Sequence, residues 1–405
     1  MSAVAGFNSA RPYVLESHKR WAISLVHAGW LSVCAAALLS LVSVYMIDVA
    51  LRAELGDKGQ GLAGEATKQV VFIAAGVLGA VLISLPHYRL IGRLSWALMA
   101  ISIALLIFLR LPGVPESIVK PINGQRCWIN LGAFKLQPSE LAKISFVLVV
   151  AHYLRFRTSH RQFFGLVPVG LIAAIPVGLI MLQPDLGTVV LFIPALFAML
   201  LAAGARLRHL AVIVVAAALA APAVYPFMQP HQKQRIMALV SQVKGDREGA
   251  FDINYQSFTA QTLTGSGELT GNGDGHARAL VRFIRLPESH NDFIFSVIGA
   301  RAGFLGGVGV LALYVTWLVG ALLVAANCKD PFGRLLCVGL FGFIAAQVVV
   351  NVGMNLGLLA AAPQGGMLAF FVLPEIWLGT WSLSYAAACC LARSAQEYNL
   401  LMERL

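Results

Sequence analysis

The sequence predicts an all-α integral membrane protein with about ten transmembrane helices. The 405-residue chain is 58% hydrophobic and only 12% charged, whereas an ordinary soluble domain is about a quarter charged. Its mean hydropathy is +0.76. Apolar runs of about 20 residues, the length that crosses a bilayer, recur along the chain with short polar segments between them. We therefore expect one polytopic membrane domain over residues 1–405 and no separate soluble domain.

The apolar runs give the positions of the expected spans. These are residues 25–49, 69–86, 94–111, 138–154, 165–182, 188–205, 209–227, 292–326, 335–353 and 371–392. The eighth run is longer than one span needs, so we expect it to begin with a partly exposed or re-entrant segment around residues 292–300. No internal repeat is evident, and the sequence does not support a repeat-built transporter.

The charges of the short loops predict the orientation, because Lys and Arg collect in the cytoplasmic loops of membrane proteins. If the N-terminus is cytoplasmic, so is the C-terminus, and every cytoplasmic segment is basic. The outer side then receives the longer loops at residues 50–68, 112–137 and 228–291, the last between the seventh and eighth spans. The basic cytoplasmic residues are Arg11, Lys19, Arg20, Arg89, Arg93, Arg155, Arg157, Arg161, Arg206, Arg208, Lys329, Arg334, Arg393 and Arg404.

The composition excludes several classes of function. The net charge of +11 is explained by the cytoplasmic loops, and no nucleic-acid-binding signature accompanies it. The six cysteines form no CxxC pair, so we expect neither a zinc site nor a disulfide framework. Motifs for ATP hydrolysis, dinucleotide binding, serine hydrolysis and zinc proteolysis are missing as well.

The first candidate region runs from the loop at 112–137 into the fourth span. Arg126 stands close to Trp128, which is typical of an anchor at the headgroup level, and an Arg fork also binds phosphate. Glu140 and Lys143 follow Gln137 and share one helix face. Ionisable groups so close to the hydrocarbon are functional candidates. The alternative is an interfacial anchor with a structural Glu–Lys pair.

Asp185 lies in a turn between two apolar runs on the predicted outer side. The sequence Pro-Asp-x-Gly at 184–187 is a turn signal, and Asp is suited to cap the helix that follows. Taken alone, the pattern favours this structural role over a role in substrate binding.

The long outer loop ends in the most informative stretch of the chain. Glu288, His290 and Asp292 lie within five residues at the mouth of the eighth span. Asp292 is followed directly by Phe-Ile-Phe, which draws it toward a low-dielectric rim where a carboxylate can serve as general base. The alternatives are a helix cap with an ion pair and a site for a divalent cation, for which this ligand pattern is not diagnostic.

Together these strings resemble the shape, elongation, division and sporulation (SEDS) family, the RodA and FtsW proteins. The resemblance spans most of the chain, and Leu-Pro-Glu-x-His-x-Asp-Phe-Ile-Phe at 286–295 is highly specific. The other matching strings are Asn-Gly-x-Arg-x-Trp-Ile at 123–129, Gln-Pro-Ser-Glu-x-x-Lys at 137–143, Gln-Pro-Asp-Leu-Gly-Thr at 183–188, Gln-Arg-Ile at 234–236, Tyr-Gln at 255–256, Gly-Ser-Gly at 265–267 with Gly-x-Gly at 271–273, and Asn-x-Gly-Met-Asn-x-Gly-Leu-Leu at 351–359.

The resemblance implies the SEDS fold and a peptidoglycan glycosyltransferase. Such an enzyme polymerises lipid II at the outer face of the bacterial inner membrane, usually with a class B penicillin-binding protein, a transpeptidase, as partner. The family's essential Asp maps onto Asp292, so we expect Asp292 to be catalytic and to orient or deprotonate the acceptor hydroxyl. The resemblance assigns no definite cofactor and leaves a divalent cation open. The residues expected to bind substrate are Arg126, Gln137, Glu140, Lys143, Asp185, Glu288 and His290.

The chain departs from the family pattern at several positions. Asn291 stands where the family usually has Thr, Ala300 and Arg301 replace two acidic residues, and the segment 360–375 lacks the family's Pro-x-Thr-Gly and Leu-Pro-Phe strings. If Arg301 lies close to Asp292, it should lower the pKa of that carboxylate.

These departures keep two alternatives to an enzyme open. One is a flippase for lipid-linked precursors, although few ionisable residues lie mid-span. The other is a non-catalytic scaffold of a cell-wall synthesis complex. The residues do not decide between a role in cell elongation and a role in cell division.

Overall fold

The computed structural model describes residues 11–55, 62, 64–84, 88–119, 121, 126–132, 135–183, 185–227, 233, 237, 240, 255–284, 286 and 289–359. This part of the chain is mostly helical. Its helices are α1 (Arg11–Leu55), α2 (Gly64–Ser84), α3 (Tyr88–Phe108), α4 (Pro138–Arg155), α5 (Val167–Met181), α6 (Leu186–Ala203), α7 (Leu207–Val224), α9 (Tyr255–Gly265), α10 (Gly273–Ile284), α11 (Ile294–Asn327) and α12 (Pro331–Asn355). Short 3-10 turns lie at Ser159–Arg161, Phe164–Leu166 and Tyr225–Phe227, and β1 (Ile129–Asn130) pairs antiparallel with β2 (Lys135–Leu136).

Within the described residues, six helical segments are long and apolar enough to cross a membrane. They are Gly29–Ala53, Leu90–Phe108, Phe164–Met181, Leu186–Ala203, Ile294–Asn327 and Pro331–Asn355. In addition, α7 contains a shorter apolar segment, and α2 and α4 overlap two further predicted spans. The predicted span 371–392 lies outside the described residues. The all-α membrane fold is confirmed, whereas the count of ten spans stays a prediction.

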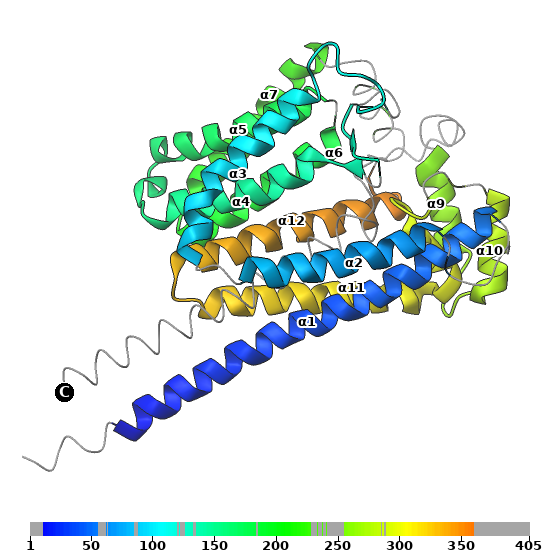
Figure 1. Ribbon diagram of the computed structural model, residues 1–405, viewed down its shortest axis with the longest axis horizontal. Helices are drawn as coiled ribbons and strands as arrows, with labels where there is room; N and C mark the ends of the chain where they lie inside the picture. Colours follow the sequence, from blue (N-terminus) through cyan, green and yellow to red (C-terminus); the bar gives the residue numbers. More distant parts are fainter. Residues whose placement is uncertain are drawn as a thin grey trace, which may run out of the picture.

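Helix α12 is shared by two hydrophobic cores. One core joins α12 to α1, α9, α10 and α11, and the other joins it to α3, α4, α5 and α6. Cys337 and Ile344 contribute to the first core, whereas Leu336 and Phe343 contribute to the second. Residues seven apart lie on one helix face, so two different faces of α12 serve the two cores. Figure 1 shows α12 running between these two groups of helices.

Small and aromatic residues bring α12 close to its neighbours. A Cβ added at Gly342 would lie only 2.7 Å from the Cα of Ala195 in α6, so the two backbones approach as closely as is typical of membrane helices with small interface residues. Nearby, Phe146 of α4, Phe192 of α6 and Phe343 pack edge to face, with ring centroids 5.1 to 6.1 Å apart. The second core is therefore tightly fitted around α12.

Helix α11 is broken at Gly303, which has a positive φ of 64°. A break frees backbone N–H groups, and within a membrane each of them needs a partner from the protein. The turn between α9 and α10 supplies these partners: Phe304 N donates to the Glu268 carbonyl at 2.8 Å, and the next N–H donates to the following carbonyl of the same turn. The long apolar run at 292–326 is thus divided into a short arm, before Gly303, and a long arm.

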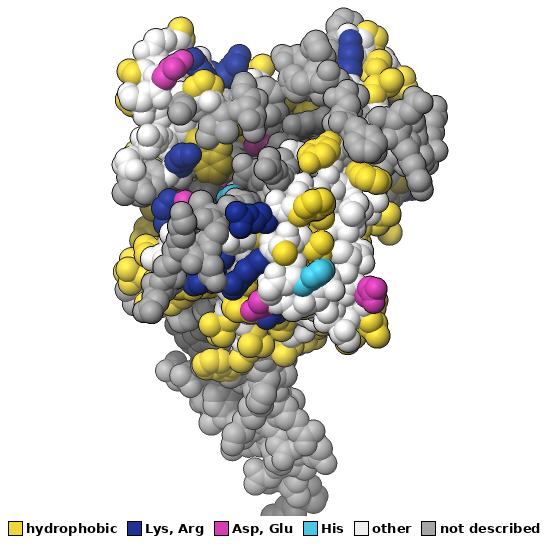
Figure 2. Space-filling model, turned by 90° about the vertical axis from the view of Figure 1, so that its right-hand side faces the viewer, with side chains coloured by type: hydrophobic (Ala, Val, Ile, Leu, Met, Phe, Trp, Pro, Cys, Tyr) yellow, Lys and Arg dark blue, Asp and Glu magenta, His cyan; other side chains and the backbone are white. Residues whose placement is uncertain are grey.

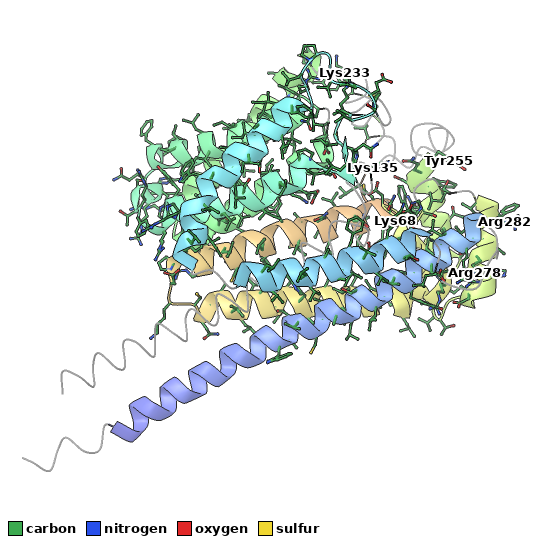
Figure 3. All side chains as sticks on the ribbon, viewed as in Figure 1. Lys68, Lys135, Lys233, Tyr255, Arg278 and Arg282 are labelled. Carbon is green, nitrogen blue, oxygen red and sulfur yellow. The ribbon has the colours of Figure 1, made fainter. Side chains whose placement is uncertain are left out.

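The two ends of the bundle carry different elements. At one end, Arg155 of α4 pairs with Asp330 at the start of α12, with 3.3 Å between Nη2 and Oδ1. The opposite end carries α9 and α10 (Figure 1), and we call it the α10 end. Figure 2 looks onto this end and shows Lys and Arg side chains near the middle of the face. Figure 3 places at the same end Lys68, Lys135, Lys233, Arg278 and Arg282.

Candidate functional site

Asp292 lies at the start of the short arm of α11, directly before the N-cap residue Phe293. Only 6% of the residue is exposed. Its backbone carbonyl accepts two hydrogen bonds from α12, from Asn351 Nδ2 and from Asn355 Nδ2, both at 3.0 Å. We call these two residues the Asn pair. Asp292 is therefore a buried acidic residue whose main chain is held by α12 and which lies near the positive end of a helix dipole.

Asn355 also completes the N-terminus of α11. Phe293 provides no side-chain cap, and the first N–H groups of a helix have no partners within it. Ser296 N donates to the Phe293 carbonyl at the N-cap and also to Asn355 Oδ1, each at 3.0 Å, and Ser296 Oγ donates to Asn355 Oδ1 at 2.6 Å. The last turn of α12 therefore caps α11 across the interface between the two helices.

His290 and Asn291 precede Asp292 on a partly buried turn. Asn291 Nδ2 lies 3.2 Å from His290 Nε2, so the amide and the imidazole are hydrogen-bonded neighbours. Glu288 lies outside the described residues. Among the side chains that the structure does describe, no three His, Cys, Asp or Glu residues form a group that could hold a metal ion.

A second group of buried polar side chains lies in the first turns of α4. Lys143 is 2% exposed and Glu140 is 9% exposed, and Lys143 Nζ lies 2.8 Å from Glu140 Oε2. The Glu–Lys ion pair, which the sequence left open as a structural alternative, is thus found. Burying such a pair costs free energy unless other polar groups compensate, and its role in substrate binding stays a prediction.

Asp185 caps α6 and faces the same pair. Thr188 N and Thr188 Oγ1 donate to its carboxylate at 3.1 and 2.7 Å, which confirms the predicted capping role, and Gln137 Nε2 lies 3.5 Å from it. Burial raises the pKa of Asp185, and the hydrogen bonds from Thr188 oppose this rise. Glu140 and Lys143 are close enough to shift the same pKa in opposite directions. We call Gln137, Glu140, Lys143 and Asp185 the α4–α6 cluster.

The chain before β1 is attached to the turn that leads into α6. Cys127 Sγ donates to the Gln183 carbonyl at 3.6 Å. Burial and, to a lesser degree, the nearby charge of Asp185 raise the pKa of the Cys127 thiol to about 12. Arg126 directly precedes this buried thiol and is itself partly buried, so it belongs to the segment that lies against the α4–α6 cluster.

The α4–α6 cluster and Asp292 lie at the same end of the bundle, because α4 and α12 are antiparallel. Arg155 at the end of α4 meets Asp330 at the start of α12, and further along Phe146 packs against Phe343. Since both helices rise by about 1.5 Å per residue, this register brings the first turns of α4 beside the last turns of α12. Those last turns carry the Asn pair, so both sites lie at the α10 end.

The sequence analysis included Asn351 and Asn355 in a matching string but assigned no role to the polar residues of α12. Gln347, Asn351 and Asn355 recur every four residues in an apolar run, and polar groups at that spacing within a span mark an interior face. Gln347 Oε1, together with Gln137 Oε1 and Ser139 Oγ at the start of α4, is buried and has no hydrogen-bond partner among the described residues. Buried polar atoms are normally satisfied, so these three are candidates for contacts with a bound molecule.

Arg301 is engaged away from Asp292. It pairs with Asp274 of α10, donates to the Tyr45 hydroxyl of α1, and has its Cζ 4.4 Å from the centroid of the Tyr45 ring. Along the helix, Arg301 lies about 13 Å from Asp292 at 1.5 Å per residue. The closeness on which the expected lowering of the Asp292 pKa depended is therefore not found.

The chain resembles known proteins over most of its length. A family model described as cell cycle protein, FtsW/RodA/SpoVE, matches residues 27–372. Stage V sporulation protein E of Bacillus subtilis is 33% identical over 298 residues, which cover 73% of this chain and 78% of that protein. A probable peptidoglycan glycosyltransferase FtsW of Nitrosococcus halophilus is 32% identical over 299 residues, 72% of this chain and 74% of that protein.

Solved structures show the same relationship. A chain from a peptidoglycan synthase complex, described for its structural coordination of polymerization and crosslinking, is 28% identical with a TM-score of 0.69, and the match covers 86% of this chain and 96% of that chain. The rod shape determining protein RodA of Thermus thermophilus is 27% identical with a TM-score of 0.57, and the match covers 86% of this chain and 95% of that chain.

Proposed function

The chain belongs to the FtsW/RodA/SpoVE family, and we propose that it is a peptidoglycan glycosyltransferase that polymerises lipid II into glycan strands. The observation that carries this proposal is the position of Asp292, a buried carboxylate held by the Asn pair at the same end of the bundle as the Glu140–Lys143 pair. Transfer from a lipid pyrophosphate needs both a base for the acceptor hydroxyl and positive charge for the leaving group.

Asp292 is the proposed general base. Its carboxylate accepts the proton of the acceptor hydroxyl while that oxygen attacks the anomeric carbon of the donor sugar. The bond from this carbon to the pyrophosphate oxygen breaks, and its electron pair leaves with the phosphate. One displacement inverts the anomeric configuration. A second carboxylate of the glycosidase kind is not needed, because the donor is already activated.

Lys143 and Arg126 are proposed to neutralise the departing pyrophosphate. Lys143 is buried and held by Glu140, so its charge acts in a low-dielectric region where electrostatic stabilisation is strong. Arg126 can bind phosphate oxygens through its planar fork. The remaining residues expected to contact the polar part of the substrate are Gln137, Asp185, Glu288 and His290.

The exterior of the bundle suits a substrate with a polyprenyl tail. Large aliphatic side chains such as Leu41, Val71 and Ile101 are exposed on its helices, as expected of surfaces that face lipid. We propose that the α10 end lies at the outer face of the bacterial inner membrane, where its Lys and Arg side chains (Figure 3) attract the anionic headgroup. The opposite end and both termini are then cytoplasmic.

The proposed partner is a transpeptidase of the class B penicillin-binding type. The similarity to a chain of a peptidoglycan synthase complex that coordinates polymerization and crosslinking supports this assignment. A polymerase of this kind supplies the strands that a transpeptidase crosslinks, so the two activities are expected to act together.

The test is polymerisation of labelled lipid II by the purified protein, alone and with its transpeptidase partner. We expect the wild type to form glycan chains. In Asp292→Asn the polymerisation rate should fall by about 10²- to 10⁴-fold, because the amide keeps the shape of the side chain but cannot accept the proton. Asp330→Asn is the matched control, because Asp330 is a buried helix cap at the opposite end. Asn caps equally well there, although the ion pair with Arg155 is lost. This control should retain activity.

If the folded wild-type protein bound to its partner forms no glycan chains, the proposal is contradicted. Translocation of lipid II without polymerisation would then indicate a flippase, and assembly of the complex without either activity would indicate a scaffold. Full activity of Asp292→Asn would leave an enzyme but remove the proposed base.

A further inference from the structure

We propose that Asn351 and Asn355 are positioning residues for the transfer reaction, which they serve by fixing the main chain that carries Asp292. The inference rests on the proposed role of Asp292 as the base. It assigns a function to a polar pair in α12 whose amides bond the backbone carbonyl of the proposed base.

The hydrogen bonds of Asn355 occupy its whole side-chain amide. Its Nδ2 donates to the Asp292 carbonyl at 3.0 Å and to the Asn351 carbonyl at 2.9 Å. Its Oδ1 accepts from Ser296 N and Ser296 Oγ. A carboxamide has two N–H donors and one oxygen with two lone pairs, so every position is used. If the Asn355 amide were flipped, its N–H groups would face Ser296 N–H and its oxygen would face the carbonyls of Asp292 and Asn351. A single orientation of the amide is therefore allowed.

Burial makes this network difficult to replace. Asn355 and Ser296 are 0% exposed and Asn351 is 2% exposed, so water does not reach them to substitute for a lost bond. A buried donor or acceptor that loses its partner bears the full desolvation penalty. The turn at Asp292 is thereby held in one geometry.

The short arm of α11 needs such a restraint, because at its other end it stops at the break at Gly303. The Asn pair lies on α12, which also packs against α4 and α6 through Phe343 and Gly342. The same helix thus sets the position of Asp292 and borders the α4–α6 cluster. By holding the Asp292 carbonyl, the Asn pair fixes the base relative to the cation proposed to receive the pyrophosphate.

The experiment measures kcat and KM for labelled lipid II in Asn351→Asp and Asn355→Asp, each with its partner transpeptidase. Both changes keep the shape of the side chain. Each replaces the NH₂ group that donates to the Asp292 carbonyl by an oxygen. We expect kcat per folded molecule to fall by about 10²-fold, the cost of a misplacement of roughly 1 Å. KM should stay within about twofold of wild type, because the pair does not touch the substrate.

The matched control is Asn327→Asp. Asn327 lies at the other end of α11, and its Nδ2 donates to the Leu323 carbonyl at 2.7 Å in an exposed position. The same chemical change there should leave both kinetic constants unaltered. Ser296→Ala removes one hydroxyl from the network and should reduce kcat about fivefold, the rate equivalent of one ordinary hydrogen bond.

A wild-type kcat in a folded Asn355→Asp protein would overturn the inference. A rise in KM of about 10²-fold without a fall in kcat would overturn it as well. If the Asp variants do not fold, an unchanged kcat in Ser296→Ala has the same consequence. Failure of the wild type itself to polymerise lipid II overturns the proposed function instead, so the two failures are distinguishable.

Discussion

Arg301, Asp274 and Tyr45 join three helices at the α10 end. Arg301 of α11 pairs with Asp274 of α10 and stacks on Tyr45 of α1, and the Tyr45 hydroxyl donates to Asp274 at 2.7 Å. The departure of Arg301 from the family pattern is therefore matched by an acidic residue on a neighbouring helix. Its charge is compensated within this cluster, so the substitution by itself does not favour a non-catalytic scaffold.

The stability given by this cluster should depend on pH. The hydrogen bond from Tyr45, opposed in part by burial and reinforced by Arg301, lowers the pKa of Asp274. A depressed carboxylate pKa stabilises the folded state above the unfolded value of about 3.9, and this contribution is lost as the pH falls through the folded value. We expect Asp274→Asn to lower the melting temperature near neutral pH, and this effect should shrink as the pH falls from about 3.9 through the lowered folded value.

Thermal unfolding of the purified protein in detergent over this pH range checks the prediction. Glu65→Gln is the control, because the ion pair of Glu65 among the described residues is with Lys68, one turn away on the surface of α2. An effect of Asp274→Asn that is the same at every pH would contradict the assigned ion pair.

At the level of single elements, the short arm of α11 is held at both of its ends by other parts of the chain, and α12 holds one of these ends. The break in α11 ends the arm that carries Asp292, and the turn after α9 bonds the N–H groups that the break frees. The last turn of α12 caps the other end of the same arm. A short helix fixed at both of its ends is a more rigid support for a catalytic group than a loop is.

Replacement of Gly303 by Ala should be severely destabilising. The added Cβ would lie 2.4 Å from Gly271 N and 2.6 Å from the Leu269 carbonyl oxygen, and the positive φ is also unfavourable for Ala. We expect a loss of about 2–4 kcal/mol from strain and overpacking. Gly309→Ala in the same helix meets open space and should stabilise it by up to about 1 kcal/mol. Melting temperatures of the two variants test this, and a harmless Gly303→Ala would rule out the described break.

For the molecule as a whole, the shared helix α12 packs in both hydrophobic cores, and its last turns lie at the α10 end beside Asp292. One core contains α11, which follows the proposed base Asp292, and the other contains α4 and α6, which carry the α4–α6 cluster. A site built between two packed halves depends on both of them, so mutations deep in either core can change activity without touching the substrate. The orientation of the bundle decides on which side of the membrane this site acts.

Cysteine labelling tests the proposed orientation in whole cells. In a background without the native cysteines, Lys135→Cys at the α10 end should react with an impermeant maleimide from outside. Arg208→Cys at the start of α7 should react only after permeabilisation. Both positions are exposed, so their reactivity reports the side of the membrane. The reverse pattern would contradict the cytoplasmic placement of the basic loops.

Sequence reasoning was enough to predict the all-α membrane class, many of the helices and several residues of the proposed site. Long apolar runs identify spans because a bilayer requires about 20 such residues wherever they occur. The Glu140–Lys143 pair and the cap at Asp185 were predictable because each depends on groups three residues apart. Asp292 was found from its motif and its apolar neighbours.

The tertiary structure alone decided how these parts meet. The bond between Ser296 and Asn355 spans 59 residues, and that between Arg301 and Tyr45 spans 256. Neither follows from hydropathy or helical periodicity, which report only neighbours along the chain. Which polar face of α12 meets which turn of α11 depends on how the helices cross and pack. Contacts of this kind exist only once the two cores have formed around the shared helix.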